Sequence, residues 1–256
     1  MELIDSHCHL DAGEFDHDRA AVIARARAAG VVQQVIPAIA AASWPGLRQV
    51  CSQAPGLYPA YGLHPIFLDQ HRPEHLEALA DWIERERPCA IGECGLDFYL
   101  DGLDAQAQRD CFDGQLRLAK RFDLPLIVHA RRATEEVIAR IKAIGGLRGV
   151  VHSFAGSPEQ ARQLWTLGFM IGLGGPVTYP RANRLRGLAA TMPLQHLLLE
   201  TDAPDQPDAS IRGQRNEPAQ LRTVLDCIAQ LRGEDAAVIA AQTTANARRL
   251  FGLPPS

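Results

Sequence analysis

The stretch LPLIVHARRATEEVIARIKAIGGLRGVVHSF, residues 124–154, contains the pattern that decides the fold class. Two short apolar runs, residues 124–131 and 149–154, flank an amphipathic segment over residues 134–146. The runs have the length and composition of buried strands, and the segment between them has helical spacing, with Gly145 where a helix C-cap belongs. A strand, a helix and a second strand in this order predict a βαβ unit, whose strands run parallel.

The same alternation extends from this unit in both directions along the chain. Amphipathic segments over residues 18–30, 74–86 and 107–122 separate further apolar runs, and two helical stretches, 217–231 and 234–250, follow the last run. The predicted strands cover residues 3–7, 31–39, 57–65, 89–97, 124–131, 149–154, 169–175 and 196–202. This order predicts an α/β fold of the (β/α)8 TIM-barrel type, with an additional C-terminal helix.

The alternative to a barrel is an open, doubly wound sheet. That fold is disfavoured because no Gly-x-Gly-x-x-Gly turn follows a predicted strand. No internal repeat, low-complexity tract or linker interrupts the pattern, so residues 1–256 are expected to form a single domain.

Composition narrows the class of protein. A chain of 256 residues with 46% hydrophobic residues can bury a large core, and its formal net charge of -4 gives no general affinity for polyanions. The start, MELIDSHC, lacks the basic and apolar regions of a secretion signal, and the apolar window 164–177 is too short to span a bilayer. A cytoplasmic protein is expected. The six scattered cysteines are expected to be free thiols, with Cys8 and Cys94 disfavoured as nucleophiles.

Imidazoles and carboxylates recur at the predicted C-terminal ends of the strands, where TIM barrels carry their catalytic groups. In an extended strand, His7 and His9 would project to the same side. A single residue of this kind would be explained by a hydrogen bond to the backbone. Several together would be costly to bury unless cations neutralise the acids and bind the nitrogens. The predicted metal ligands are His7, His9, Glu93, His129, His152 and Asp202.

Six ligands exceed the three that a single catalytic zinc uses, so we expect two divalent ions. Glu93 is expected to bridge them at a separation of about 3.5 to 4 Å. One ion would be held by His7, His9, Glu93 and Asp202, and the other by Glu93, His129 and His152. The donor set leaves Zn, Mn or Mg open, although imidazoles favour zinc or manganese over magnesium.

The ordered motifs resemble those of the TatD family of metal-dependent hydrolases over nearly the whole chain. They are DSHCHLD (5–11), GLHP (62–65), GECGLDFY (92–99), HAR (129–131), HSFAG (152–156), ETDAP (200–204) and RNEP (215–218). The resemblance implies a TIM barrel, a divalent metal centre at the same six residues, and metal-dependent deoxyribonuclease activity, often 3′ to 5′ exonucleolytic. Some similar proteins are linked instead to deacylation of mischarged tRNA. The chain departs from the family at Cys94, where an aliphatic residue is more usual.

Other two-metal barrel hydrolases can bridge their ions with a carbamylated lysine. The only lysines here, Lys120 and Lys142, fall inside helical segments, which leaves Glu93 as the bridge. The cations would lower the pKa of a water molecule, and Asp202 is the candidate general base. The resemblance places His64 near the substrate phosphate. The predicted catalytic residues are Asp202 and Glu93, and the predicted substrate-binding residues are His64, Arg131 and Arg215.

Several positions keep two interpretations. His64 could instead stack on the turn at Pro65. Asp5 could hold the second nitrogen of a ligand or be a buried acid bonded to serine or backbone groups. Asn216 could orient a ligand or fix its loop. Tyr99 could stack on a nucleobase, although packing against a helix is preferred.

The leading functional hypothesis is a two-metal deoxyribonuclease that binds DNA, or another phosphodiester or ester, at the barrel mouth. The alternative is an ester or amide hydrolase, such as a D-aminoacyl-tRNA deacylase or a small-molecule amidohydrolase, using the same metal centre. A third hypothesis, zinc in a purely structural role, is disfavoured by the surplus of ligands. Neither a membrane nor an obligate protein partner is expected.

Overall fold

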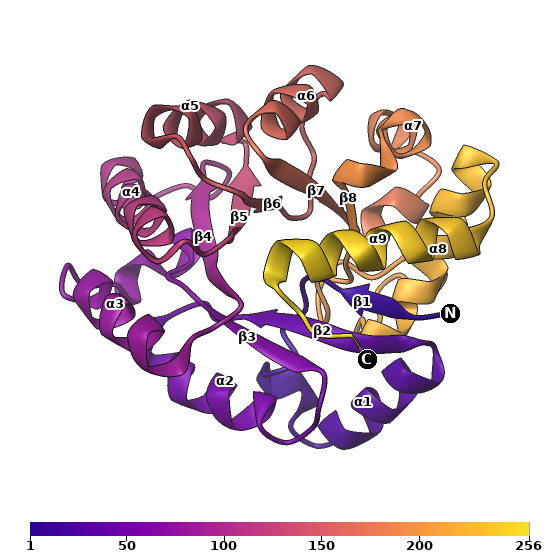
Figure 1. Ribbon diagram of the computed structural model, residues 1–256, viewed down its shortest axis with the longest axis horizontal. Coiled ribbons are helices and arrows are strands. Elements are labelled where there is room, and N and C mark those ends of the chain that lie inside the picture. The colour runs from indigo at the N-terminus through magenta and orange to yellow at the C-terminus, as the bar shows by residue number, and fades with distance from the viewer. Residues whose placement is uncertain (256) are drawn as a thin grey trace. The chain divides into compact units, whose positions relative to one another are not determined.

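The computed structural model describes residues 1–255 and shows strands and helices alternating along the chain (Figure 1). Within these residues, eight strands form one sheet in the order β1-β2-β3-β4-β5-β6-β7-β8. Every strand pairing whose register is described is parallel. This is the architecture of the (β/α)8 TIM-barrel class, and it confirms the predicted fold class.

The strands begin close to their predicted starts. β4 and β5 end at the predicted residues, 97 and 131, and the other six strands end earlier than predicted. They are β1 (Leu3–Asp5), β2 (Val31–Pro37), β3 (Leu57–Tyr61), β4 (Ala90–Asp97), β5 (Leu126–Arg131), β6 (Gly149–Val151), β7 (Phe169–Leu173) and β8 (Leu197–Leu199). The helices are α1 (Arg19–Ala28), α2 (Trp44–Cys51), α3 (His75–Glu86), α4 (Ala105–Phe122), α5 (Thr134–Ile144), α6 (Pro158–Thr166), α7 (Asn183–Thr191), α8 (Leu221–Arg232) and α9 (Ala236–Phe251).

The chain divides into two compact units. The first unit comprises Met1–Ile36, Val50–Tyr58 and the described part of Ile171–Ser256. The second unit comprises Pro37–Gln49 and Pro59–Met170.

In the second unit, β4 is buried along its whole length and pairs with β5, which pairs in turn with β6. Helix α4 covers β4 and buries Phe112 and Leu116. Its start is set by Asp104, whose carboxylate accepts hydrogen bonds from the N–H groups of Gln106 (2.8 Å) and Ala107 (3.1 Å). Such an N-cap contributes about 1 kcal/mol to helix stability. The N-cap therefore fixes the first turn of α4, and the buried side chains hold the helix against β4.

In the first unit, the C-terminal helix α9 packs against β1 and β8. Its Asn246 is fully buried and donates from Nδ2 to the carbonyl oxygens of Leu194 (2.7 Å) and Leu197 (2.9 Å). The hydroxyl of Thr244 donates to the carbonyl of Glu2 at 3.0 Å. The additional helix predicted at the C-terminus is therefore present, and it holds the starts of two strands.

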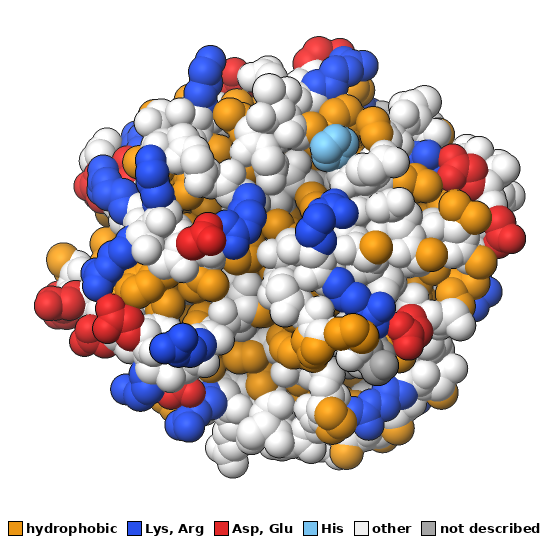
Figure 2. Space-filling view, in the orientation of Figure 1, with side chains coloured by type: hydrophobic (Ala, Val, Ile, Leu, Met, Phe, Trp, Pro, Cys, Tyr) orange, Lys and Arg blue, Asp and Glu red, His pale blue; other side chains and the backbone are white. Residues whose placement is uncertain are grey.

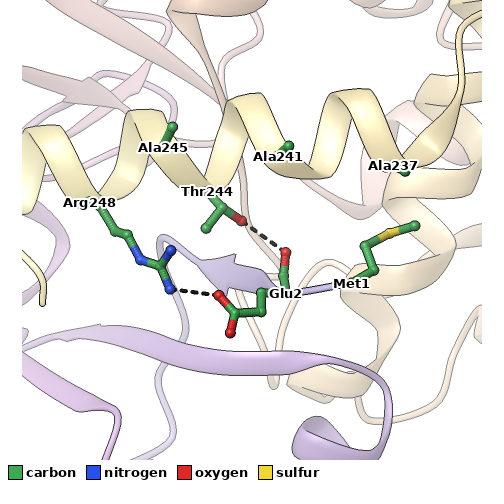
Figure 3. A pocket seen from close by; sticks show the side chains of 7 residues that line it. All are labelled: Met1, Glu2, Ala237, Ala241, Thr244, Ala245 and Arg248. Atoms are coloured by element: carbon green, nitrogen blue, oxygen red, sulfur yellow. Dashed lines mark hydrogen bonds and ion pairs between the residues drawn. The ribbon is translucent and has the colours of Figure 1, made fainter. Parts of the chain in front are cut away.

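A pocket of about 580 Å³ lies beside α9 in the first unit (Figure 3). Met1 and Glu2 line it together with residues of the helix, and Arg248 forms an ion pair with Glu2 at 2.8 Å. These residues precede β1, whereas His7 and His9 follow it. The pocket therefore lies at the opposite end of the strand from the predicted metal ligands.

On the face drawn in Figure 2, basic side chains are dispersed among acidic, hydrophobic and uncharged ones. In residues 1–255, no helix is both long enough and apolar enough to cross a membrane.

Candidate metal centre

His7, His9 and Asp202 form a cluster in the first unit. The Nε2 atoms of His7 and His9 lie 3.2 Å apart, and Oδ1 of Asp202 lies 3.3 Å from His7 Nε2 and 3.7 Å from His9 Nε2. His7 is fully buried, and Asp202 is 9% exposed. Each residue directs one ligand atom to a common point, with the three atoms within 4.8 Å of one another.

The two histidines converge for a reason other than the predicted one. Strand β1 ends at Asp5, so His7 and His9 do not lie in an extended strand, and the expectation based on strand alternation was wrong. The following segment is held by backbone hydrogen bonds from Cys8 N–H to Val35 O (3.2 Å) and from His9 N–H to Ala203 O (2.7 Å). The loop, rather than the strand pleat, brings the rings together.

Asp5 fixes the backbone beneath this cluster. Its carboxylate accepts hydrogen bonds from the hydroxyl of Thr201 (2.6 Å), the N–H of Thr201 (3.0 Å) and the N–H of His7 (3.3 Å). Burial raises the pKa of Asp5 to about 7, against the hydrogen bonds that lower it. The contacts of Asp5 are therefore those of a buried acid bonded to hydroxyl and backbone groups, and they join the ends of β1 and β8.

Asp202 is positioned by the loop that follows β8. Its backbone has a φ of 59°, in the left-handed region that aspartate tolerates better than most residues, and its N–H donates to His7 O at 2.9 Å. The Gln206 amide donates to Oδ2 of the same carboxylate. Buried Asn216 donates from Nδ2 to Thr201 O and Asp205 O, both at 2.8 Å. Asn216 thus fixes the loop, one of its two predicted roles.

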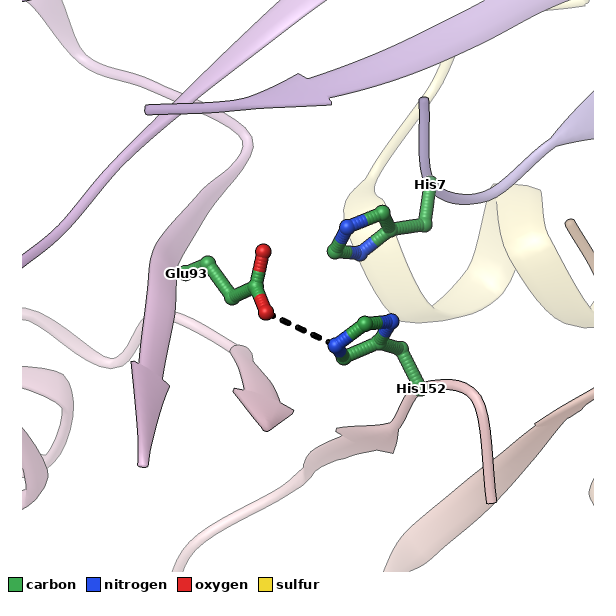
Figure 4. A group of neighbouring side chains, drawn as sticks. All are labelled: His7, Glu93 and His152. Carbon is green, nitrogen blue, oxygen red and sulfur yellow. Dashed lines mark ion pairs between the residues drawn. The ribbon is translucent and has the colours of Figure 1, made fainter. Parts of the chain in front are cut away.

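Glu93 is the centre of a second cluster, in the second unit. Its Oε1 atom lies 2.7 Å from Nε2 of His152, 2.8 Å from Nε2 of His64 and 3.2 Å from Nδ1 of His129. Figure 4 shows the contact between Glu93 and His152. Glu93, His64 and His152 are each less than 5% exposed. Three imidazoles thus surround one buried carboxylate oxygen.

Glycines allow the chain to pack closely around Glu93. A Cβ atom at Gly62 would lie 2.7 Å from the Glu93 carbonyl oxygen, and one at Gly92 would lie 2.7 Å from Cβ of Ile127. At Gly95, which has a φ of 136°, a Cβ would come within 2.0 Å of His129 O. The GECG motif therefore serves close approach of neighbouring strands as well as the site itself.

His64 contacts Glu93 as a hydrogen-bond donor. Its Nδ1 accepts a hydrogen bond from the N–H of Ile66 at 3.1 Å, so the neutral ring carries its proton on Nε2, the atom that faces Glu93. This arrangement suits a residue that orients the carboxylate. The predicted substrate-binding role of His64 stays a prediction.

Asp97 orients His129 from the other side of the ring. Its Oδ2 lies 2.9 Å from His129 Nε2, which leaves Nδ1 directed at Glu93. Burial lowers the pKa of His129, but its hydrogen bonds to Asp97 and Glu93 outweigh burial and raise the pKa to about 9. Two carboxylates thus favour positive charge at this imidazole.

Both clusters fit a divalent cation by donor type, burial and spacing. The first offers two imidazoles and a carboxylate, the second a carboxylate and several imidazoles, and groups within each have ligand atoms within 4.8 Å of one another. In the first cluster two imidazole nitrogens face each other, and in the second three rings surround one carboxylate oxygen. A bound cation would stabilise both arrangements, because the nitrogen and oxygen lone pairs would then coordinate one positive charge.

The other candidate residues lie outside these clusters. Arg215 pairs through both terminal nitrogens with Asp18, at 2.8 and 2.7 Å, so its guanidinium is engaged by a carboxylate. Arg131 packs on the ring of Tyr99, 3.7 Å from the centroid. Burial raises the pKa values of the Cys8 and Cys94 thiols well above normal, which disfavours their thiolates.

Neither the place of Gln206 in the site nor the contact of Asp97 with His129 was predictable from the sequence motifs. Gln206 lies four residues after Asp202, in the segment that continues the ETDAP motif. That spacing is the only sequence signal for its contact.

A TIM barrel with buried clusters of imidazoles and carboxylates following its strands defines the class of metal-dependent hydrolases. Residues 4–252 match the family described as TatD related DNase. The chain is 42% identical to the uncharacterized metal-dependent hydrolase YjjV of Escherichia coli K12, over 98% of each sequence. The crystal structure of that TatD homologue superposes with a TM-score of 0.93 at 40% identity, covering 98% of both chains.

A second relative, the 3′-5′ ssDNA/RNA exonuclease TatD of Klebsiella pneumoniae, is 34% identical over 98% of both sequences. The chain therefore belongs to the TatD family and is a metal-dependent hydrolase.

Proposed function

We propose that the protein is a deoxyribonuclease that hydrolyses phosphodiester bonds of single-stranded DNA, in the manner of a 3′ to 5′ exonuclease. The observation that carries the proposal is the pair of buried donor clusters, His7–His9–Asp202 and Glu93–His129–His152. Family membership and the names of TatD relatives as single-strand exonucleases support the choice of substrate.

The metal requirement in this proposal is two divalent cations, one at each cluster. Glu93 as a shared ligand stays a prediction, supported by its three close imidazoles and by the positions of Lys120 and Lys142 in helices α4 and α5. Imidazole donors favour zinc or manganese, and magnesium would require more oxygen ligands. When bound, such cations lower the pKa of water and stabilise negative charge on phosphate oxygens.

The chain's own residues supply proton transfer and orientation. Asp202 accepts the proton of the attacking water, because Oδ1 of its carboxylate faces His7 and Oδ2 is held by the Gln206 amide. Asp97 holds His129 with Nδ1 toward Glu93. Burial of His7, Glu93 and His152 keeps bulk water away from these donor groups, which strengthens electrostatic interactions in the site.

The test is hydrolysis by the purified protein after loading with Zn, Mn or Mg and measurement of bound metal per chain. End-labelled single-stranded DNA is compared with a D-aminoacyl-tRNA and a simple ester, and Asp202→Asn is the inactive variant. We expect shortening of the DNA from its 3′ end, with a loss of about 10² to 10⁴ in rate for Asp202→Asn and little change in the melting temperature of the metal-free protein. Intact DNA with hydrolysis of the aminoacyl-tRNA or the ester would overturn the proposal.

Asp205→Asn is a matched control for this variant. Asp205 lies in the same loop, but its side chain is exposed, and its N–H donates to Asp202 O. The rate should therefore stay close to that of the wild type.

A further inference from the structure

Tyr99 is an exposed aromatic residue beside the second cluster. It is 44% exposed, so it does not have the packed environment that sequence analysis preferred for it. It follows the end of β4, two residues after the Asp97 that contacts His129. An aromatic side chain held out to solvent next to a catalytic cluster requires an explanation other than core packing.

Two arginines lie on this ring. The guanidinium carbon of Arg131 is 3.7 Å from the ring centroid, and that of Arg132 is 4.6 Å from it. Both residues are exposed. Arg132 has a φ of 54°, an uncommon backbone conformation for a residue other than glycine, asparagine or aspartate.

These arginines differ from other arginines of the second unit in their partners. Arg109 and Arg140 bind Glu136 through short ion pairs. Across residues 1–255, the described contacts of the Arg131 and Arg132 guanidiniums are with Tyr99, and neither forms an ion pair with a carboxylate. Their charge and hydrogen-bond donors are therefore available to an anion.

Asp97 fixes this group of residues relative to the cluster. One oxygen of Asp97 accepts hydrogen bonds from the N–H groups of Tyr99 (2.9 Å) and Leu100 (3.2 Å), and the other contacts His129 Nε2 at 2.9 Å. The N–H of Phe98 donates to Arg131 O at 2.9 Å, so β4 and β5 remain paired up to this point. The same carboxylate thus orients a candidate metal ligand and the exposed aromatic residue.

We propose that Tyr99, Arg131 and Arg132 form a nucleotide-binding platform for single-stranded nucleic acid, in which a base stacks on Tyr99 and the neighbouring phosphate binds the two guanidiniums. Bases stack on exposed aromatic rings and guanidinium planes whatever their sequence, and guanidinium forks suit phosphate oxygens. A base in a duplex has no free face, so the platform selects single strands. This inference rests on the proposed nuclease function and assigns residues to its substrate recognition.

Binding is the first readout. Metal-loaded Asp202→Asn protein, which does not consume its ligand, is titrated into a fluorescent single-stranded oligothymidylate, and the Kd is obtained from anisotropy. Adding Tyr99→Ala should raise the Kd at least about fivefold, because a stacked base contributes that much or more, whereas Tyr99→Phe should retain the Kd. Arg132→Ala should weaken binding and reduce its dependence on salt concentration, since one phosphate contact is lost.

The control for Arg132 is Arg87→Ala. Arg87 is also exposed with a positive φ, of 48°, but lies at the C-cap of α3, before β4 begins. Its removal should leave the Kd unchanged. An oligomer of abasic sugar phosphates has no base that could stack on Tyr99. Its Kd should therefore be the same for the protein that retains Tyr99 and for the Tyr99→Ala variant.

Cleavage by the otherwise wild-type enzyme separates the two proposals. Tyr99→Ala should raise the KM for single-stranded DNA more than it lowers kcat. A Tyr99→Ala variant that cleaves and binds oligothymidylate like the wild type would overturn the platform and leave the nuclease function standing. A wild-type protein that neither binds nor cleaves single-stranded DNA would overturn both.

Discussion

Glu93 shows at the scale of a residue how charge rather than shape defines the site. Glutamine could occupy the same space and still accept hydrogen bonds from the imidazoles. It could not neutralise a divalent cation or the positive charge that two carboxylates favour on His129. The function of Glu93 is therefore separable from its packing.

Glu93→Gln should fold and yet lose bound metal and activity. We expect a loss of at least about 10²-fold in hydrolysis, as for other groups that orient or hold a catalytic metal. Metal per chain is measured by elemental analysis and folding by circular dichroism. Glu84→Gln, which removes an exposed carboxylate paired with Arg121, is the control and should keep both metal and activity. Full metal content in Glu93→Gln would contradict its assignment as a ligand.

At the scale of elements, the loop after β8 is tied to the start of α1. Asp18 precedes the helix and binds Arg215 and Arg25, while Glu217 binds Arg25 at 2.7 Å. The hydrogen bond from Arg215, together with that from Arg25, holds the pKa of Asp18 well below its usual value of 3.8. Arg215 thus anchors the chain between the Asp202 loop and α8.

This arrangement predicts an effect of Arg215 on stability that depends on pH. Because folding lowers the pKa of Asp18, its ionised form stabilises the fold fully above its usual pKa of 3.8. That stabilisation declines below pH 3.8 and is lost as the pH falls through the lowered pKa of the folded state. Arg215→Ala and Asp18→Asn should each lower the melting temperature at pH 7, and the two changes should not add.

Thermal melts of the two single variants and the double variant between pH 3 and pH 7 test this expectation. The advantage of the wild type over Asp18→Asn should begin to shrink at the acidic end without disappearing, because the Asp18 carboxyl of the folded protein is protonated only well below its usual pKa. If Arg215→Ala raised the KM for DNA without altering the melting temperature, Arg215 would instead be a substrate ligand, as predicted from the sequence.

The order of elements was predictable from sequence, and the orientation of side chains beyond strand ends was not. Apolar runs located all eight strands described in residues 1–255, since buried strands need continuous apolar residues. The positions of His7 and His9 depend on hydrogen bonds to Val35 and Ala203, which no local pattern encodes. The exposure of Tyr99 likewise depends on Asp97, which holds the backbone beyond β4.

At the scale of the whole molecule, the candidate metal ligands come from chain segments far apart in sequence. The first cluster joins residues 7 and 9 to residue 202, and the second joins residue 93 to residues 129 and 152. A cation bound at either cluster therefore links distant segments of the folded chain. An unfolded chain does not present these ligands together, so binding favours the folded state.

Metal removal should lower the melting temperature of the protein. At a free metal concentration about 100 times the Kd, one site adds about 2.7 kcal/mol to the free energy of unfolding. We expect the chelated protein to melt at a lower temperature and to recover when zinc or manganese is restored. Asp202→Asn should show a smaller rise on metal addition than Asp205→Asn. Equal melting temperatures with and without metal would contradict the two clusters as cation sites.

The division of the chain between the two units has a consequence for synthesis on the ribosome. The second unit is complete once Met170 has emerged, whereas the first unit needs both the earliest residues and the segment from Ile171 onward. Helix α9, which holds the starts of β1 and β8, follows all eight strands along the chain and is therefore translated after them. His7 and His9 therefore leave the exit tunnel long before Asp202 exists, and a nascent chain can assemble the Glu93 cluster first.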